Sequence, residues 1–268
     1  MEDKNHILLN NLLYSCVNEK YRGSEQFVKE HALGYIISGE SHFFTNEGTK
    51  IAPAGSIGMV RRNQLIKSLK VPPADGGEFK SININLGQEF LRKYAVDHKI
   101  EPVGRYTGDH IIPMPADPFL IGYFNSLVPY FTHKIQPSES MSELKTQEAV
   151  ELILRINPNL KYFLFDFNEP HKIDLEAFMN KNFTYNVPAE QFARLTGRSL
   201  AGFKRDFGKI FNTTPGQWLQ KKRLDEAHYL ITRKGRKVSE VYLDVGFENL
   251  SHFSYAFKKA FGISPSLA

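Results

Sequence analysis

Apolar and polar residues alternate over short runs in the first third of the chain. The clearest run is 80–86, in which Ile82, Ile84 and Leu86 are apolar and the residues between them are polar. A period of two is typical of a strand with one buried face. Further short apolar runs lie between turns that contain Gly, Asn or Pro, at residues 32–37, 41–45, 50–51, 56–60 and 65–71. Many short strands between such turns predict a small β-barrel or sandwich.

The spacing of apolar residues becomes helical in the middle of the chain. Residues 119–131 form an aromatic-rich segment, which Pro129 should kink or end. Residues 142–156 place apolar side chains along one broad face, and the following Asn157-Pro158 is a helix stop signal. These two segments predict helices that follow the strands.

A polar, proline-containing segment at residues 168–171 predicts a hinge between two domains. We therefore expect an N-terminal domain at residues 1–168 and a C-terminal domain at residues 169–268. Beyond the hinge, the apolar spacing is helical almost throughout. One long helix is expected to open at Pro215 and to end in a basic cluster at residues 233–237.

The last hundred residues repeat one pattern. Each copy has a short helix, a glycine where the chain must turn, and a second helix with phenylalanines four residues apart. The turn glycines are Gly197 and Gly246, and the phenylalanines are Phe203, Phe207, Phe211, Phe253, Phe257 and Phe261. This is the layout of a helix-turn-helix, whose second helix enters the major groove of DNA. An ordinary amphipathic helix bundle would use the same phenylalanines as core.

The positive charge is concentrated in the segment that carries this repeat. The chain has 34 Lys and Arg and 29 Asp and Glu, a net charge of +5. Residues 172–268 hold 16 of the basic and nine of the acidic residues, an excess of seven positive charges. The preceding residues hold 18 basic and 20 acidic side chains. Such asymmetry is expected where one end of a chain meets a polyanion, and together with the repetition it favours DNA binding.

The outer face of each second helix supplies the candidate DNA contacts. Arg205 is suited to bond a guanine edge through two hydrogen bonds, and Lys204 and Lys209 are suited to phosphates. The second copy has no charged base-reading side chain at these positions, and it can contact thymine methyl groups and the DNA backbone. Asn212 is predicted to end the first of these helices in the left-handed conformation. The candidate DNA-binding residues are Ser199, Ala201, Gly202, Lys204, Arg205, Lys209, Leu250, Ser251, Ser254, Tyr255, Lys258 and Lys259.

Several other function classes lack their motifs. No stretch approaches the length of a membrane-spanning helix, so we expect a cytoplasmic protein with no membrane partner. Cys16 is the single cysteine, which excludes an internal disulfide and a Cys-based zinc site. His31, His42, His98 and His110 are scattered without metal-ligand spacing. Phosphate-loop and nucleophile motifs are absent from the sequence, so we expect no metal, no cofactor and no enzyme activity.

These residues resemble the AraC/XylS family of bacterial transcription regulators, over about the last hundred residues. The matching segments are Gly246-Phe247, Ser251-His252-Phe253, Ala256-Phe257-Lys258, residues 261–265, Thr213-Thr214-Pro215, Arg223-Leu224 and Ala227. The resemblance implies two helix-turn-helix units on either side of a long helix, which enter successive major grooves on one face of DNA. This chain departs from the family at Tyr255, usually arginine, and at Asn212, usually glycine.

The same resemblance implies which residues read bases. In the first unit they are Ala201, Lys204 and Arg205, and in the second they are Leu250, Ser251, Ser254 and Tyr255. It further implies a cupin-like N-terminal barrel that senses an effector, with helices that dimerise. The chain is most similar to the subgroup whose N-terminal domain is controlled by partner proteins.

The predicted fold class is therefore α+β, with a β-rich cupin-like barrel and helices followed by an all-α domain of two helix-turn-helix units joined by a long helix. The predicted function is a sequence-specific transcription regulator. The expected partners are double-stranded DNA, a small-molecule or protein effector at the N-terminal domain, a second copy in a homodimer, and RNA polymerase. The alternative is a cupin-like ligand- or protein-binding scaffold whose helical half makes protein contacts only. A cupin-type enzyme is the third hypothesis, and its usual histidine pair is absent.

Overall fold

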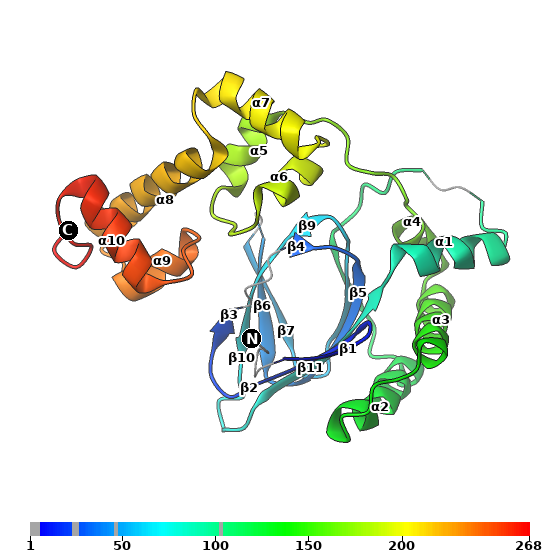
Figure 1. Cartoon of the computed structure of the whole chain (residues 1–268). Helices are drawn as coiled ribbons and strands as arrows, with labels where there is room; N and C mark the ends of the chain where they lie inside the picture. The colour runs from blue at the N-terminus through cyan, green and yellow to red at the C-terminus, as the bar shows by residue number, and fades with distance from the viewer. Residues whose placement is uncertain (1–5, 23–26, 46–47, 102–103) are drawn as a thin grey trace. The chain divides into compact units, whose positions relative to one another are not determined.

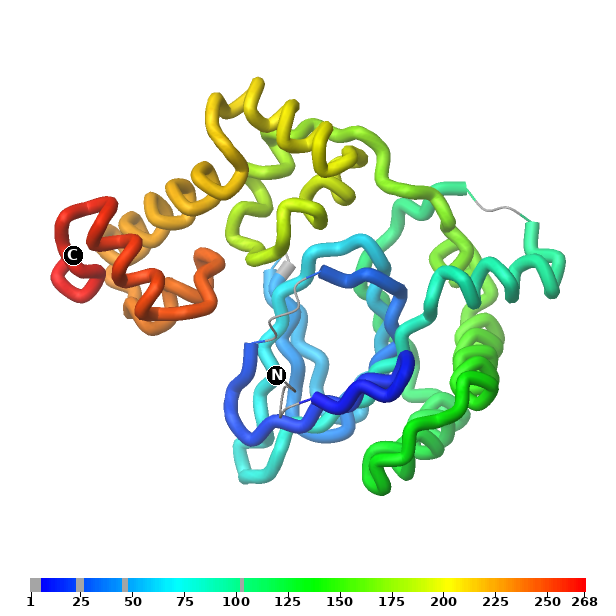
Figure 2. Tube along the Cα trace, viewed as in Figure 1, coloured from blue at the N-terminus to red at the C-terminus, as the bar shows by residue number. Residues whose placement is uncertain are grey.

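The computed structural model describes residues 6–22, 27–45, 48–101 and 104–268 (Figures 1 and 2). They form two compact units, one made mainly of residues up to Asn168 and the other mainly of residues from Glu169 onward. Within this part of the chain, the last strand ends at Met114, and only helices follow Glu169.

Antiparallel sheets form the body of the first unit. The strands are β1 (His6–Leu9), β2 (Leu12–Val17), β3 (Tyr21–Arg22), β4 (Phe27–Val28), β5 (His31–Ser38), β6 (Glu40–Thr45), β7 (Gly48–Pro53), β8 (Ile57–Val60), β9 (Gln64–Leu65), β10 (Lys67–Val71), β11 (Phe79–Leu86) and β12 (Ile111–Met114). One sheet has the order β1-β2-β11-β5-β8-β12, another has β3-β10-β6-β7, and β4 pairs with β9. The two larger sheets curve around a common interior in Figure 2, which agrees with the predicted cupin-like barrel.

The alternation predicted for residues 80–86 is confirmed by β11. Its residues Ile82, Ile84 and Leu86 have no exposed surface. The strand lies between β2 and β5, and it pairs antiparallel with both. The other predicted strand runs are confirmed as well, with the run 65–71 divided between β9 and β10. The alternation therefore located the central strand of the larger sheet.

Helices α1 (Gln88–Asp97), α2 (Pro118–Thr132), α3 (Glu139–Ile156) and α4 (Lys161–Leu164) pack on the larger sheet. Their contact forms the core of the unit, in which Leu33 and Ile82 of the sheet meet Phe124 and Ile153 of the helices. The sequence pattern allowed α2 to end at Pro129, but the helix continues to Thr132. The side chains of Leu127 and Phe131 are buried on both sides of this proline, and their packing offsets the missing backbone hydrogen bond.

The second unit consists of α5 (Leu175–Asn182), α6 (Ala189–Leu195), α7 (Leu200–Phe211), α8 (Pro215–Thr232), α9 (Val238–Asp244) and α10 (Leu250–Phe261). The long helix α8 opens at Pro215 as predicted, and the Thr214 hydroxyl caps it by accepting from the backbone N–H of Gln217. Figure 1 shows α8 between α5–α7 on one side and α9–α10 on the other. The structure thus has two helix pairs, α6–α7 and α9–α10, on one shared helix.

Buried charges hold the end of the first unit in place. The Arg62 side chain is 3% exposed and donates to the backbone carbonyls of Asp166 (3.2 Å) and Asn168 (3.1 Å). The Asp166 carboxylate forms an ion pair with Arg61 and accepts from the backbone N–H of Tyr106. The hydrogen bonds that this carboxylate accepts from Tyr106 and Asn168, together with the Arg61 guanidinium, lower the pKa of Asp166 despite its burial. The chain therefore leaves this unit from a fixed position.

His31 adjoins this cluster and should make the first unit sensitive to acid. Its imidazole is fully buried, and burial and the nearby Arg62 and Arg61 lower its pKa to about 3. Between an unfolded-state pKa of about 6.5 and this value, only the unfolded chain takes up the proton. Stability should therefore fall as pH decreases through this window, with a slope that approaches about 1.4 kcal/mol per pH unit.

Urea unfolding of the full chain between pH 7 and pH 4 measures this slope. The His31→Gln variant should lose most of it, although its stability at pH 7 will also be lower. His133→Gln is the matched control, because that residue is exposed and its replacement should leave the slope unchanged. Equal slopes for the wild-type chain and His31→Gln would contradict the assignment.

Candidate nucleic-acid interface

Helices α7 and α10 share their length, their caps and their phenylalanine positions, at an offset of fifty residues. Each spans 12 residues. Each begins at a polar cap, because the side chains of Ser199 and Asn249 accept a hydrogen bond from the backbone N–H three residues on, at 3.2 and 3.0 Å. Each ends at a left-handed residue, Asn212 (φ 52°) or Gly262 (φ 79°). The predicted cap at Asn212 is confirmed, whereas the sequence analysis did not single out Asn249.

The two helices also bury corresponding phenylalanines. Phe203, Phe207, Phe253 and Phe257 are fully buried. The next phenylalanine of each series packs on α8: the Phe211 ring centroid lies 4.8 Å from that of Trp218, and the Phe261 ring centroid lies 4.6 Å from that of His228. Both helices are therefore fixed to the same long helix by their aromatic faces, which leaves their opposite faces for solvent or a partner.

The first of these outer faces is basic. Ala201, Lys204, Arg205 and Lys209 are exposed, as is Ser199 at the cap, while Gly202 is half-buried. The Arg205 side chain is 67% exposed, and its Nε lies 3.6 Å from a carboxylate oxygen of the neighbouring Asp206. The guanidinium thus remains accessible at the surface of α7.

The second outer face is basic only in the last turn of α10, where Lys258 and Lys259 lie, and it is polar, aromatic and aliphatic before that. Tyr255 is 69% exposed and Leu250 is 42% exposed. Ser251, Lys258 and Lys259 are also exposed, and Ser254 is half-buried. Ten of the twelve candidate residues are therefore exposed, and Gly202 and Ser254 are half-buried.

Each pair of helices is joined at a glycine in the left-handed conformation. Backbone atoms from another segment of this chain lie close around each of these glycines. Gly197 has φ +64° and Gly246 has φ +97°. A Cβ atom at Gly197 would lie 2.2 Å from the carbonyl carbon of His171, and one at Gly246 would lie 2.5 Å from the carbonyl oxygen of Thr184. Both positions therefore require glycine for conformation and for space.

Residues 169–174 pack along the turn between α6 and α7, which contains Gly197. Arg198 donates to the backbone carbonyl of Ile173 at 2.9 Å, and Arg194 forms an ion pair with Glu169 at 3.5 Å. Lys172 lies 3.3 Å from the Asp206 carboxylate, to which the Nε of Arg198 also donates at 3.1 Å. The hydrogen bonds from Arg198 and Lys172 lower the pKa of Asp206. The segment predicted as a hinge thus has fixed contacts with the first helix-turn-helix.

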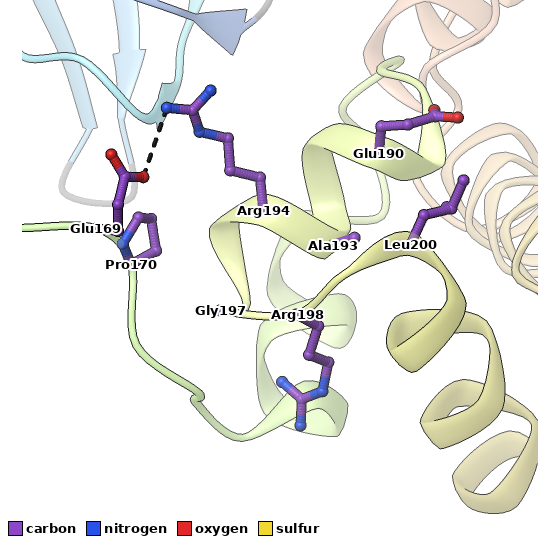
Figure 3. Close-up of a pocket in the computed structure, with 8 residues that line it drawn as sticks. All are labelled: Glu169, Pro170, Glu190, Ala193, Arg194, Gly197, Arg198 and Leu200. Carbon is purple, nitrogen blue, oxygen red and sulfur yellow. Dashed lines mark ion pairs between the residues drawn. The ribbon is translucent and has the colours of Figure 1, made fainter.

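An open cavity of about 330 Å³ lies beside this segment (Figure 3). Its lining residues are Glu169, Pro170, Glu190, Ala193, Arg194, Gly197, Arg198 and Leu200. Figure 3 shows Glu169 and Arg194 pointing toward each other, whereas Arg198 points to another side of the turn. The cavity contains none of the candidate DNA-binding side chains, so it is separate from the outer faces of α7 and α10.

Arg223 of α8 connects the two helix pairs, a role that the sequence analysis missed. Its side chain is buried and donates to the backbone carbonyls of Phe183 (2.7 Å), Tyr185 (2.7 Å) and Gly246 (3.1 Å). Burial lowers its pKa to about 10, so it remains charged at neutral pH. One guanidinium therefore connects three parts of the C-terminal unit: the segment before α6, the helix α8, and the turn between α9 and α10.

Across residues 6–22, 27–45, 48–101 and 104–268, no group of three or more His, Cys, Asp or Glu side chains could hold a metal ion. Nor is any helix of these ranges both long and apolar enough to cross a membrane.

Two helix-turn-helix units on a shared helix, each with an accessible polar face, define a DNA-binding protein. Known families give the same result. Residues 192–267 match the model of a helix-turn-helix domain, and residues 31–164, half of the chain, match the ExsA N-terminal regulatory domain. The chain belongs to the AraC/XylS family of transcription regulators, with a regulatory domain before its DNA-binding domain.

Similar proteins cover different parts of the chain. The HTH-type transcriptional regulator ExsA of Pseudomonas aeruginosa is 25% identical over 249 residues, which are 89% of this chain and 85% of that protein. The virulence regulon transcriptional activator VirF of Yersinia enterocolitica is 30% identical over 94 residues, 35% of each chain. A crystal structure of an apo ToxT variant from Vibrio cholerae aligns over 96% of both chains, with a TM-score of 0.46 and 14% identity.

Proposed function

We propose that this regulator inserts α7 and α10 into successive major grooves on one face of DNA, and that residues 1–168 control this binding. The observation that supports the proposal is the matched construction of the two helices. Both are capped, fixed to α8 by phenylalanines, and open to a partner on the opposite face. A recognition helix has to be rigid on one side and polar on the other, and both helices meet this requirement.

We assign the contacts by the chemistry of each side chain. Arg205 reads a guanine edge, because its guanidinium matches the O6 and N7 acceptors. Lys204, Lys209, Lys258 and Lys259 neutralise phosphates, which sets position and affinity without reading sequence. The remaining candidates, Ser199, Ala201, Gly202, Leu250, Ser251, Ser254 and Tyr255, lie against bases or the adjacent sugar-phosphate backbone.

Replacing Arg205 and Lys209 separately tests these roles. Arg205→Ala should reduce discrimination at one base pair by a factor that corresponds to about 1–3 kcal/mol, because the bidentate contact is lost. Lys209→Ala should weaken binding to all sequences alike and reduce the slope of log affinity against log salt by about one. Fluorescence anisotropy measures both effects, with an operator selected from a random duplex pool by the full chain and with single-base variants of that operator.

Lys93→Ala is the control for these variants, because Lys93 is an exposed lysine of α1 in the first unit. It should change neither the discrimination nor the salt slope. Unchanged base preferences and salt slopes in both Arg205→Ala and Lys209→Ala would show that α7 does not lie in the major groove. Affinity for random DNA that does not vary with salt would support the alternative, a scaffold whose helical half binds only proteins.

We further propose that the chain acts as a homodimer and that an effector, either a partner protein or a small molecule, acts on the N-terminal domain. Exposed apolar side chains at the beginning of α3, Met141 and Leu144, support a dimer surface there. RNA polymerase is the expected partner once the chain is bound at a promoter. Sedimentation equilibrium of the full chain, with and without operator DNA, tests the dimer.

A further inference from the structure

The offset of fifty residues makes α7 and α10 directly comparable, position by position. Lys209 corresponds to Lys259, so both helices keep a lysine in the last turn. Lys204 and Arg205 correspond to Ser254 and Tyr255, however. The same backbone thus presents two cations on α7, and a hydroxyl group and an aromatic ring on α10.

The position of Tyr255 on α10 suits a base contact. Leu250, Ser251, Ser254 and Tyr255 are spaced i, i+1, i+4 and i+5, so they share one side of the helix. The buried Phe253 lies on the other side of the helix from Ser251 and Tyr255. Two of the four, Leu250 and Tyr255, are large apolar side chains that remain exposed at 42% and 69%.

The chemistry of this face excludes one kind of readout and favours another. Guanine recognition in the major groove relies on a cationic side chain that donates to O6 and N7. None of these four side chains is cationic, and the lysines of α10, Lys258 and Lys259, lie in its last turn, away from the N-terminal residues that contact bases. Thymine is the base that offers an apolar group in the major groove, its C5-methyl. An aromatic ring and a leucine can remove that methyl group from water, which is favourable by the hydrophobic effect.

We propose that α10 reads thymine methyl groups through Tyr255 and Leu250, so that the operator has a guanine-containing part for α7 and a thymine-containing part for α10. This inference rests on the proposed function, because it requires both helices to lie in major grooves. It makes Tyr255 a specificity-determining residue of the second helix-turn-helix. The two parts of the operator would then differ chemically.

Replacing thymine by deoxyuridine tests the contact, since this change removes the methyl group and keeps every hydrogen-bonding group of the base. The operator is first selected from a random duplex pool with the full chain. Guanines whose replacement by 7-deazaguanine weakens the wild-type chain but not Arg205→Ala mark the part read by α7. Each thymine in the other part is then replaced by deoxyuridine. At the contacted thymines we expect affinity to fall about fourfold per methyl group.

Variants of Tyr255 connect the effect to this side chain. Tyr255→Phe keeps the ring, so it should show the same loss on deoxyuridine as the wild-type chain. Tyr255→Ala should bind the thymine and deoxyuridine operators equally at the position that Tyr255 contacts. Tyr255→Arg restores the side chain found at the corresponding position of α7, and it should shift the selected base at that position toward guanine. Because Tyr255 is mostly exposed, these variants should fold normally.

The outcomes separate this inference from the proposed function. Wild-type affinity that is the same for thymine and deoxyuridine throughout the second part would overturn the inference, while sensitivity to 7-deazaguanine would still support α7 in the groove. An equal deoxyuridine loss in Tyr255→Ala and the wild-type chain would also overturn the role of Tyr255. Failure to select any operator would reject the proposed function and the inference together.

Discussion

Replacing Arg223 by methionine is expected to lower the free energy of unfolding of the C-terminal unit by about 3–5 kcal/mol. Methionine fills a similar volume but donates no hydrogen bond. The carbonyls of Phe183, Tyr185 and Gly246 would then lose the guanidinium, and backbone acceptors cannot be removed with it. The full cost of unsatisfied buried acceptors therefore remains, unlike in the replacement of a complete buried ion pair. Urea unfolding followed by Trp218 fluorescence measures the loss.

Two further variants make the Arg223 prediction specific. Lys221→Met changes a side chain of the same helix that is 80% exposed, and it should alter stability by less than about 0.5 kcal/mol. Arg223→Lys keeps the charge but cannot span three carbonyls with a planar fork, so it should recover only part of the loss. DNA affinity should fall together with stability, because the guanidinium ties both helix pairs to α8. A methionine variant as stable as Lys221→Met would show that the three contacts contribute little.

Replacing Gly197 by alanine is expected to destabilise the same unit by at least about 2 kcal/mol more than replacing Gly235. Both glycines have almost the same backbone conformation, with φ of +64° and +62°. A Cβ atom at Gly235 would meet open space, whereas one at Gly197 would overlap the backbone of His171 and Lys172. Gly235→Ala should therefore report only the conformational cost, about 1 kcal/mol, and Gly197→Ala should add the clash.

Unfolding free energies of the two alanine variants, measured under the same conditions, isolate this steric contribution. Binding to the operator should follow the same order, since the Gly197 turn sets the start of α7. Equal losses at Gly197 and Gly235 would mean that residues 169–174 move away at little cost. The close packing of that segment on the first turn would then be unimportant for stability.

Sequence periodicity predicted the elements whose burial is one-sided. The strand β11 alternates because one of its faces packs in the core and the other does not. Helices α7 and α10 have a phenylalanine every four residues because one side of each helix faces the core. Asn212 was predictable for a local reason, since asparagine is one of the few residues that adopt the left-handed conformation at low cost. In each of these elements, a local preference and the tertiary packing agree.

The elements that were missed lack such a local signal. The strand β2 reads Leu-Leu-Tyr-Ser-Cys-Val and does not alternate cleanly, because polar Ser15 is buried together with Leu12 and Val17. Helix α1 begins at Gln88, and its N-cap residue Gly87 has no side chain to cap it, so the usual start signal is absent. Arg223 was visible as a family match, but charged side chains are rarely buried, and only the fold shows its three carbonyl partners.

The packing of residues 169–174 on the turn between α6 and α7 limits how far the second unit can be truncated at its N-terminus and remain stable. A fragment that starts at Leu175 keeps all six helices of the second unit. It nevertheless loses the carboxylate beside Arg194, the carbonyl beside Arg198 and the backbone that encloses Gly197. A protease that releases a stable DNA-reading fragment should therefore cleave before Glu169, and fragments trimmed further should unfold at lower temperature.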